Sequence, residues 1–233
     1  MTALAAKKYA RLAGVLFLLS MLGGGFGEAY APSKLIVSND ATATAANLKN
    51  SDFLFRLGYA AYLVEAICDV ALAWVLYVLL RPVHKDLALL SAFFGLVSTA
   101  TFAIGELHYY SSALALRDAA YLQSFSADQR NTLAMLSLKT FGIGSSIFMA
   151  FYGIGWILRG YLISRSTYLP KFIGILCLIA GLGFTIQNFL FILAPQYGSR
   201  LLYLPMFLAG LSLTVWFLWK GVDERKWEES STR

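Results

Sequence analysis

The chain has few charged residues, only two cysteines and no long polar segment. Charged residues make up 14% of its 233 positions. A soluble domain of this size would need more polar surface, so the composition excludes an ordinary soluble fold. The two cysteines, Cys68 and Cys177, have no CxxC spacing and give no reason to expect a disulfide. No basic patch with stacking aromatics stands clear of an apolar run, which argues against nucleic-acid binding.

What is abundant is apolar sequence: 58% of the residues are hydrophobic, and the mean hydropathy is +0.64. Because about 20 apolar residues cross a bilayer as a helix, the pattern predicts an all-α polytopic transmembrane bundle of six helices. The expected spans are 10–30, 54–80, 87–116, 133–163, 170–194 and 201–220. Residues 1–221 would form a single domain with one substantial outside loop at 32–53, and residues 222–233 would form a charged, solvated cytoplasmic tail.

The Lys and Arg residues predict the orientation. Twelve of them, Arg159 included, flank the side that holds the termini, and six flank the other side. The positive-inside rule therefore predicts that both termini are cytoplasmic. This arrangement also accounts for the net charge of +6 without a nucleic-acid partner.

A signal peptide is an alternative interpretation of the first span. Basic residues at 7–11, an apolar stretch and Ala29-Tyr30-Ala31 resemble a secretory leader with an A-x-A cleavage site. Cleavage would leave five spans and an outside N-terminus. The apolar stretch reaches nearly to Tyr30, which is longer than a usual signal core, so we favour a retained first span.

Two acids, Glu65 and Asp69, lie inside the second apolar run. They are four residues apart and so share one helix face. A carboxylate within hydrocarbon costs at least about 2.5 kcal/mol, so it usually faces a partner, a cavity or a proton pathway. The pair is therefore the strongest functional signal in the chain.

Other polar residues also lie within the apolar runs or at their ends. They are Glu28, Arg56, Glu106, His108, Lys139, Gln187 and Asn188. Counted at about 1.5 Å per residue, most of them fall in the extracytoplasmic half of the bilayer. This agreement predicts one outward-facing polar cavity that binds a ligand or an ion, with the Glu65–Asp69 pair at its floor. Glu106 and His108 are two residues apart, so at most one of them would join a tight site.

Structural pairing is the alternative interpretation of the same residues. Lys139 would neutralise Glu65 or Glu106, and Arg56 would pair with Glu28. The acids outnumber the nearby bases, and this imbalance favours a functional site.

The outside loop carries its own signal. Residues 39–47 are typical of a short helix capped by Asp40 or Thr42. Such a helix would lie at the membrane surface, over the mouth of the bundle.

Three functions remain open. The first is binding or transport of a small molecule, lipid or ion, with the bilayer and a small amphiphile or cation as partners. The second is a membrane-embedded enzyme, hydrolytic or metal-assisted; Glu65, Asp69, Glu106 and His108 carry suitable atoms, but no HExxH spacing or GxSxG elbow is present. The third is a structural or accessory subunit. We expect no metal and no cofactor, and the chain is more simply explained as a non-enzyme.

Several short motifs carry a family resemblance. They are Ala10-Arg11-Leu12-Ala13-Gly14, Ser33-Lys34-Leu35-Ile36-Val37, Asp40 to Asn47, Phe55-Arg56-Leu57-Gly58, Cys68-Asp69, Tyr77 to Val83, Gly160-Tyr161-Leu162-Ile163, Leu169 to Gly174 and Ala180-Gly181. In their order and spacing the chain resembles the bacterial membrane family called domain of unknown function 4386. The resemblance implies a multi-pass protein of the bacterial inner membrane and no substrate. It places Arg56, Asp69 and Arg81 in shared-looking motifs, whereas Lys139 stands where the family often has acidic and histidine residues.

Overall fold

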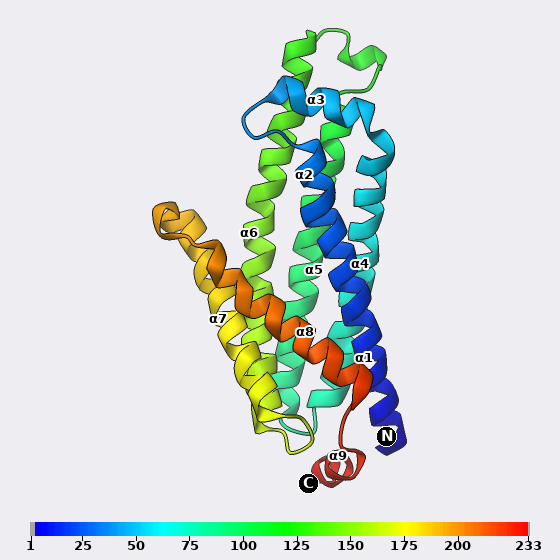
Figure 1. Cartoon of the computed structure of the whole chain (residues 1–233), viewed down its shortest axis with the longest axis vertical. Coiled ribbons are helices and arrows are strands. Elements are labelled where there is room, and N and C mark those ends of the chain that lie inside the picture. The colour runs from blue at the N-terminus through cyan, green and yellow to red at the C-terminus, as the bar shows by residue number, and fades with distance from the viewer. Residues whose placement is uncertain (1–2, 233) are drawn as a thin grey trace.

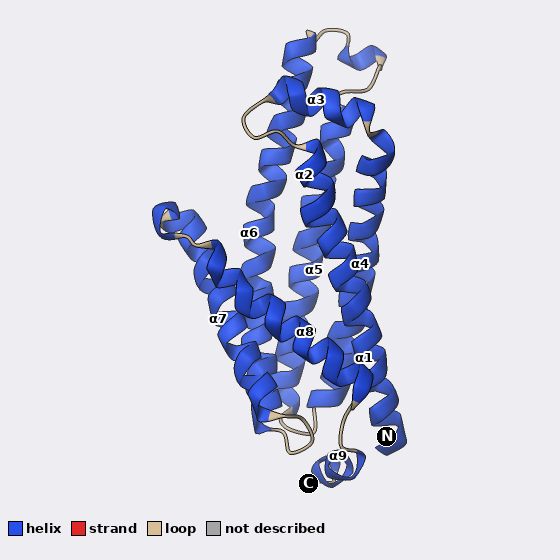
Figure 2. Cartoon of the chain, viewed as in Figure 1, coloured by secondary structure: helices blue, strands red, loops and turns tan. Residues whose placement is uncertain are grey.

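The computed structural model describes residues 3–232, and within that range it is helical and contains no strand (Figure 2). Six of its helices are long and apolar enough to cross a membrane, which confirms the predicted fold class. The elements are α1 (Ala3–Gly24), the π-helix η1 (Gly25–Tyr30), α2 (Ala31–Leu35), α3 (Ala41–Asn50), α4 (Asp52–Leu80), α5 (Lys85–Leu114), η2 (Ala120–Leu122), α6 (Ala127–Arg165), α7 (Lys171–Leu193), η3 (Pro195–Tyr197), η4 (Arg200–Tyr203), α8 (Leu204–Trp219) and α9 (Glu224–Ser231).

The bundle has two unlike halves (Figure 1). A continuous rod of α1, η1 and α2 runs beside α4, α5 and α6 along most of its length, whereas the α7–α8 hairpin ends partway up. Both ends of the chain lie at the same end of the bundle, as an even number of crossings requires. We call the half that carries the termini the proximal half and the other the distal half.

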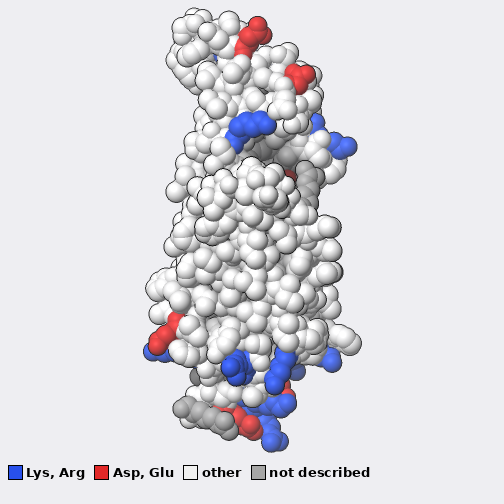
Figure 3. All heavy atoms as spheres, turned by 90° about the vertical axis from the view of Figure 1, so that its left-hand side faces the viewer, with Lys and Arg blue, Asp and Glu red and all other residues white. Residues whose placement is uncertain are grey.

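Charge is distributed unevenly along the bundle axis. Figure 3 shows Lys and Arg gathered at the proximal end, next to a broad belt that is almost free of charged side chains. The belt is the surface expected to face hydrocarbon. The proximal basic end is the one that the positive-inside rule predicts to be cytoplasmic.

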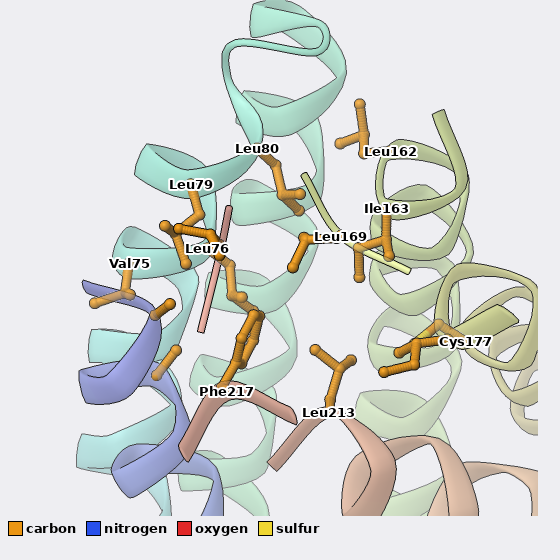
Figure 4. Close-up of a cluster of buried hydrophobic side chains, with 14 of the residues drawn as sticks. Val75, Leu76, Leu79, Leu80, Leu162, Ile163, Leu169, Cys177, Leu213 and Phe217 are labelled. Atoms are coloured by element: carbon orange, nitrogen blue, oxygen red, sulfur yellow. The ribbon is translucent and has the colours of Figure 1, made fainter. Parts of the chain in front are cut away.

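The proximal half is closely packed. Leu76, Leu79, Ile163 and Phe217 belong to one buried apolar cluster formed by α1, α4, α6, α7 and α8 (Figure 4). Glycines bring α6 and α7 into backbone contact: a Cβ on Gly181 would lie 2.6 Å from the carbonyl oxygen of Gly153. Small residues allow this approach, and packing of this kind is what holds helices together in a membrane.

The C-terminal segment is part of this packing. It was expected to be a solvated tail, but it forms α9, and its Trp227 is only 1% exposed. The Trp227 indole donates to the Leu79 carbonyl at 3.1 Å, and the Tyr168 hydroxyl donates to the same oxygen at 2.8 Å. Burial raises the pKa of the Tyr168 phenol, which therefore stays protonated as a donor. An ion pair of 3.2 Å between Lys7 and Glu224 joins α9 to α1.

The helix α3 lies across the distal part of the bundle, and the connection between α5 and α6 extends beyond it (Figure 1). Asp40 caps this helix by accepting from the Ala43 amide at 2.8 Å, which confirms the predicted capped helix. The first span is longer than predicted, because η1 and α2 continue it past Pro32 to Leu35. Pro32 directly follows the π-helical turn, and the backbone stays helical through Tyr30 and Ala31 into α2.

Candidate functional site

A π-helical turn interrupts the first span where the bundle opens. The wider turn covers Gly25–Tyr30 and carries Glu28. Single π-turns within helices occur often at functional sites, because they change the direction of side chains. Glu28 is exposed and borders two cavities, so this turn directs a carboxylate into open space inside the bundle.

The larger of these cavities has a volume of about 300 Å³ and lies between α1–η1, α4, α6, α7 and α8. Two acids, Glu28 and Glu65, lie on its wall. The rest of the wall is mainly aromatic and sulfur-containing side chains, with Ser20 and three glycines between them. The aromatic and methionine residues are Phe17, Met21, Tyr152, Trp156, Phe184, Tyr203, Met206 and Phe207.

Two smaller cavities continue the first towards the bundle axis. The second, of about 150 Å³, shares Glu28, Glu65 and Tyr152 with the first and adds Asp69. The third, of about 10 Å³, shares Asp69 and Tyr152 with the second and adds Arg159. We call the three together the intramembrane cavity. Its acids lie in the two larger parts, and its guanidinium borders the smallest part.

Glu65 lies close against the first helix. A Cβ on Gly24 would lie 2.9 Å from its Oε1, so the carboxylate occupies the space that the glycine leaves free. Its Oε2 is buried and has no hydrogen-bond partner among residues 3–232. A buried oxygen without a partner carries a desolvation cost of about 1–3 kcal/mol. Glu65 is therefore a carboxylate in a costly environment, with space in front of it for a ligand.

Asp69 and Arg159 form the floor of the intramembrane cavity. Asp69 accepts a hydrogen bond of 2.9 Å from Ser20. The guanidinium of Arg159 lies against Gly95, where a Cβ would be 2.7 Å from its Nη2. Arg159 is 6% exposed and belongs to α6, so it is not one of the loop-flanking charges it was counted among. It lies six residues, or about 9 Å, inside the end of that helix.

Three of the predicted site residues, His108, Lys139 and Arg56, are exposed and do not border the cavities described above. His108 and Lys139 are exposed on the surfaces of α5 and α6. Arg56 pairs with Asp52 at 2.7 Å and not with Glu28. Helix rotation places these residues outside the bundle, although their depth along the axis was the reason for grouping them with Glu65.

Glu106 is buried but separate from the cavity walls. It is 3% exposed, and neither of its carboxylate oxygens has a partner within the described residues. It lies one turn from Tyr109, whose hydroxyl also has no partner. The two groups add to the unsatisfied polar atoms of the distal half.

Gln187 and Asn188 have structural contacts in the α7–α8 hairpin. The Gln187 side-chain oxygen accepts from the Ser199 amide at 2.9 Å, which holds the turn after α7. Asn188 donates to the Phe184 carbonyl at 2.7 Å. Both side chains are buried, and neither borders the cavities described above.

Within residues 3–232 there is no group of three or more His, Cys, Asp and Glu side chains that could hold a metal ion. Tyr152, Trp156, Ser20 and Arg159 border the cavity but were not predicted as site residues. The position of Arg159 well inside the fourth span was a signal in the sequence that could have identified it.

Comparison with known proteins identifies a family for the chain. A protein of Archaeoglobus fulgidus, described as an uncharacterized protein, is 30% identical over 126 residues, which are 53% of this chain and 60% of that relative. The match thus spans less than two thirds of the relative's length. No solved structure matches the chain significantly. Residues 12–221 match the family described as Domain of unknown function (DUF4386), and the chain belongs to that family.

Proposed function

We propose that the intramembrane cavity binds a small organic cation. The observation that carries the proposal is that Glu28 and Glu65 lie on the wall of a cavity of about 300 Å³ whose other walls are mainly aromatic. Carboxylates supply the negative charge that such a ligand needs. The faces of tryptophan and tyrosine attract quaternary ammonium groups, and this attraction strengthens away from water.

The charge balance supports a cation over an anion. Three acids border the cavity, Glu28, Glu65 and Asp69, against one base, Arg159. The base lies next to the smallest part, whereas Glu28 and Glu65 border the part large enough for a ligand. A ligand in the larger part would therefore meet two carboxylates first.

The dimensions favour a compact ligand. A volume of about 300 Å³ is at the lower end of ligand pockets. The Trp156 ring borders this space together with Tyr152 and Tyr203, so a quaternary ammonium group there would meet aromatic rings. Choline is a compact cation with such a group and is the probe we choose.

The proposal concerns binding, and transport would be a use of the same site. The metal-assisted enzyme has no comparable support, because the described residues lack a converging ligand set. The accessory-subunit hypothesis does not require two acids, Glu28 and Glu65, on the wall of a cavity.

The test is equilibrium binding of labelled choline to the protein in nanodiscs of phosphatidylglycerol, a lipid without a cationic group. Empty nanodiscs give the background, and the neutral isostere 3,3-dimethyl-1-butanol tests the role of charge. We expect choline to bind at least about tenfold more tightly than the isostere, and Glu65→Gln to weaken choline binding by about tenfold or more. Glu228→Gln, in the exposed part of α9, is the matched control. Equal binding of choline and isostere, or equal binding to both variants, would contradict the proposal.

A further inference from the structure

We infer that the ligand of the intramembrane cavity is a membrane amphiphile, which enters sideways from the bilayer between α1–η1 and α8. Its cationic headgroup would lie at Glu28 and Glu65, and its alkyl chain would leave through this opening into the lipid. We call the opening the lateral gap; it is lined by Met21, Gly25, Phe207 and Gly210. The inference rests on the proposed function and specifies the class of ligand.

The lateral gap results from the way α8 crosses α1. The helices touch at Gly14, where a Cβ would lie 2.9 Å from the backbone nitrogen of Leu218. Further along, a Cβ on Gly210 would meet the Met21 sulfur only at 3.7 Å. At Gly25 it would meet nothing within 4 Å. The two elements therefore diverge from a tight crossing into a wedge, and Figure 1 shows α8 running obliquely away from the first rod.

The wedge opens on the surface that faces lipid. Phe207 lines the cavity and is also 58% exposed, so one side chain belongs both to the cavity wall and to the outer surface. Leu22, three residues before Gly25, is 62% exposed on that surface. Both residues lie in segments that are apolar enough to cross a membrane. The cavity is therefore accessible from the hydrocarbon side of the bundle.

The chemistry changes along this path. The four residues of the lateral gap have no charged side chain, and their one polar atom is the weakly accepting sulfur of Met21, which accepts from Thr214; Glu28 and Glu65 lie behind them. An apolar passage that leads to carboxylates matches a molecule with a cationic head and an alkyl tail. A polar solute arriving from water would gain nothing from an apolar passage on the lipid side.

The test compares chain length in two glycine variants. Dodecyltrimethylammonium and choline are each used to displace labelled choline from the protein in phosphatidylglycerol nanodiscs. The variants are Gly25→Phe, which fills the lateral gap, and Gly142→Phe. Gly142 also has nothing within 4 Å of its Cβ, but it lies on α6 away from the described cavities. Every sample contains the same lipid, so the amphiphile partitions into the bilayer to the same extent in each. This partitioning therefore does not affect the comparison of affinity ratios between variants.

We expect the ratio of dodecyltrimethylammonium affinity to choline affinity to fall at least about tenfold in Gly25→Phe and to stay at the wild-type value in Gly142→Phe. The same ratio in all three proteins would overturn the lateral route while leaving choline binding, and so the proposed function, intact. Failure of the wild-type protein to bind choline would instead overturn both.

A second variant covers the case in which Gly25→Phe does not fold. Phe207→Ala shortens a side chain that is largely exposed, so its removal leaves the buried packing in place. It removes apolar contact with the alkyl chain of the amphiphile, and we expect the ratio of dodecyltrimethylammonium affinity to choline affinity to fall several-fold. A ratio equal to that of the wild type would again contradict the lateral route.

Discussion

The proximal and distal halves share the long helices α4, α5 and α6 but satisfy their polar groups differently. In the proximal half the Leu79 carbonyl accepts from both Tyr168 and Trp227, and glycines close the α6–α7 interface. With the exception of the Trp216 indole, the buried polar atoms without partners lie on residues at the cavity or beyond it. They belong to Tyr62, Glu65, Glu106, Tyr109 and Trp156. The comparison indicates that the packed proximal end stabilises the fold, whereas the cavity and the region distal to it give up stability for a site.

The largest expected effect is in the proximal half. Gly181→Val places side-chain atoms against the Gly153 carbonyl oxygen and the Ile157 amide nitrogen, where a Cβ already lies at 2.6 Å from each. Since both are backbone atoms, the helices must separate, and we expect a loss of about 3 kcal/mol in the free energy of unfolding. Thermal unfolding in non-ionic detergent measures it. Gly142→Ala, in open space, should cost nothing; equal losses in the two variants would contradict the comparison.

The next effect has the opposite sign. Glu106→Leu removes two buried oxygens that have no partner, and we expect the free energy of unfolding to rise by about 1–2 kcal/mol. Glu106→Gln retains the shape and a polar end and should give a smaller gain. The same denaturation experiment measures both. A loss of stability in Glu106→Leu would mean that this carboxylate is satisfied in the protein, and the contrast between the halves would be weaker.

Two donors share one acceptor in the proximal half, which gives a test of coupling. Tyr168→Phe and Trp227→Phe each remove one hydrogen bond to Leu79, at 2.8 and 3.1 Å. We expect the double variant to lose about 1 kcal/mol or more in the free energy of unfolding. Whichever substitution is made first should cost less than the one that follows it, because after the first the remaining donor still satisfies the carbonyl. A double-mutant cycle of unfolding free energies measures the coupling. Strict additivity would show that the two bonds act independently.

The smallest expected effect concerns the exposed Arg56–Asp52 pair. The two side chains are 63% and 55% exposed, with a separation of 2.7 Å. Arg56→Ala should change the free energy of unfolding by no more than about 0.5 kcal/mol, as for other exposed pairs. It should also leave choline binding at the wild-type level, measured in the nanodisc assay. A clear loss of binding would place Arg56 in the site, as its sequence context had suggested.

The fold was predictable because hydrophobic runs set the number of spans. The six hydrophobic runs and the helix cap at Asp40 could both be identified in the sequence. The helix α9 was not predicted, because a charged segment with one buried tryptophan looks like a solvated tail. The start of α6 was placed too late, because the capping box of Ser126 and Gln129 precedes the apolar run. Capping chemistry marks that boundary more sharply than hydropathy does.

The depth of the site residues along the helices was predictable from the sequence, but the direction in which their side chains face was not. Glu28, Glu65 and Asp69 were grouped by their position along the helices, and they border one cavity system. Depth also grouped Lys139 with them, yet this residue faces outward. Helices in a membrane are apolar on the lipid side as well as on the packed side, so periodicity does not reveal which face is inside. Arg159 was missed for the related reason that a basic residue near a helix end was counted as a flanking charge.

The central claim is that the acids and aromatics of the intramembrane cavity hold an organic cation, and locating such a cation tests it most directly. Crystals grown with arsenocholine, in which arsenic replaces the quaternary nitrogen of choline, would give an anomalous signal at the cationic centre. We predict one peak between Glu28 and Glu65, within about 6 Å of the Tyr152 or Trp156 ring. A cavity without a peak, or peaks confined to the outer surface of the bundle, would contradict the account.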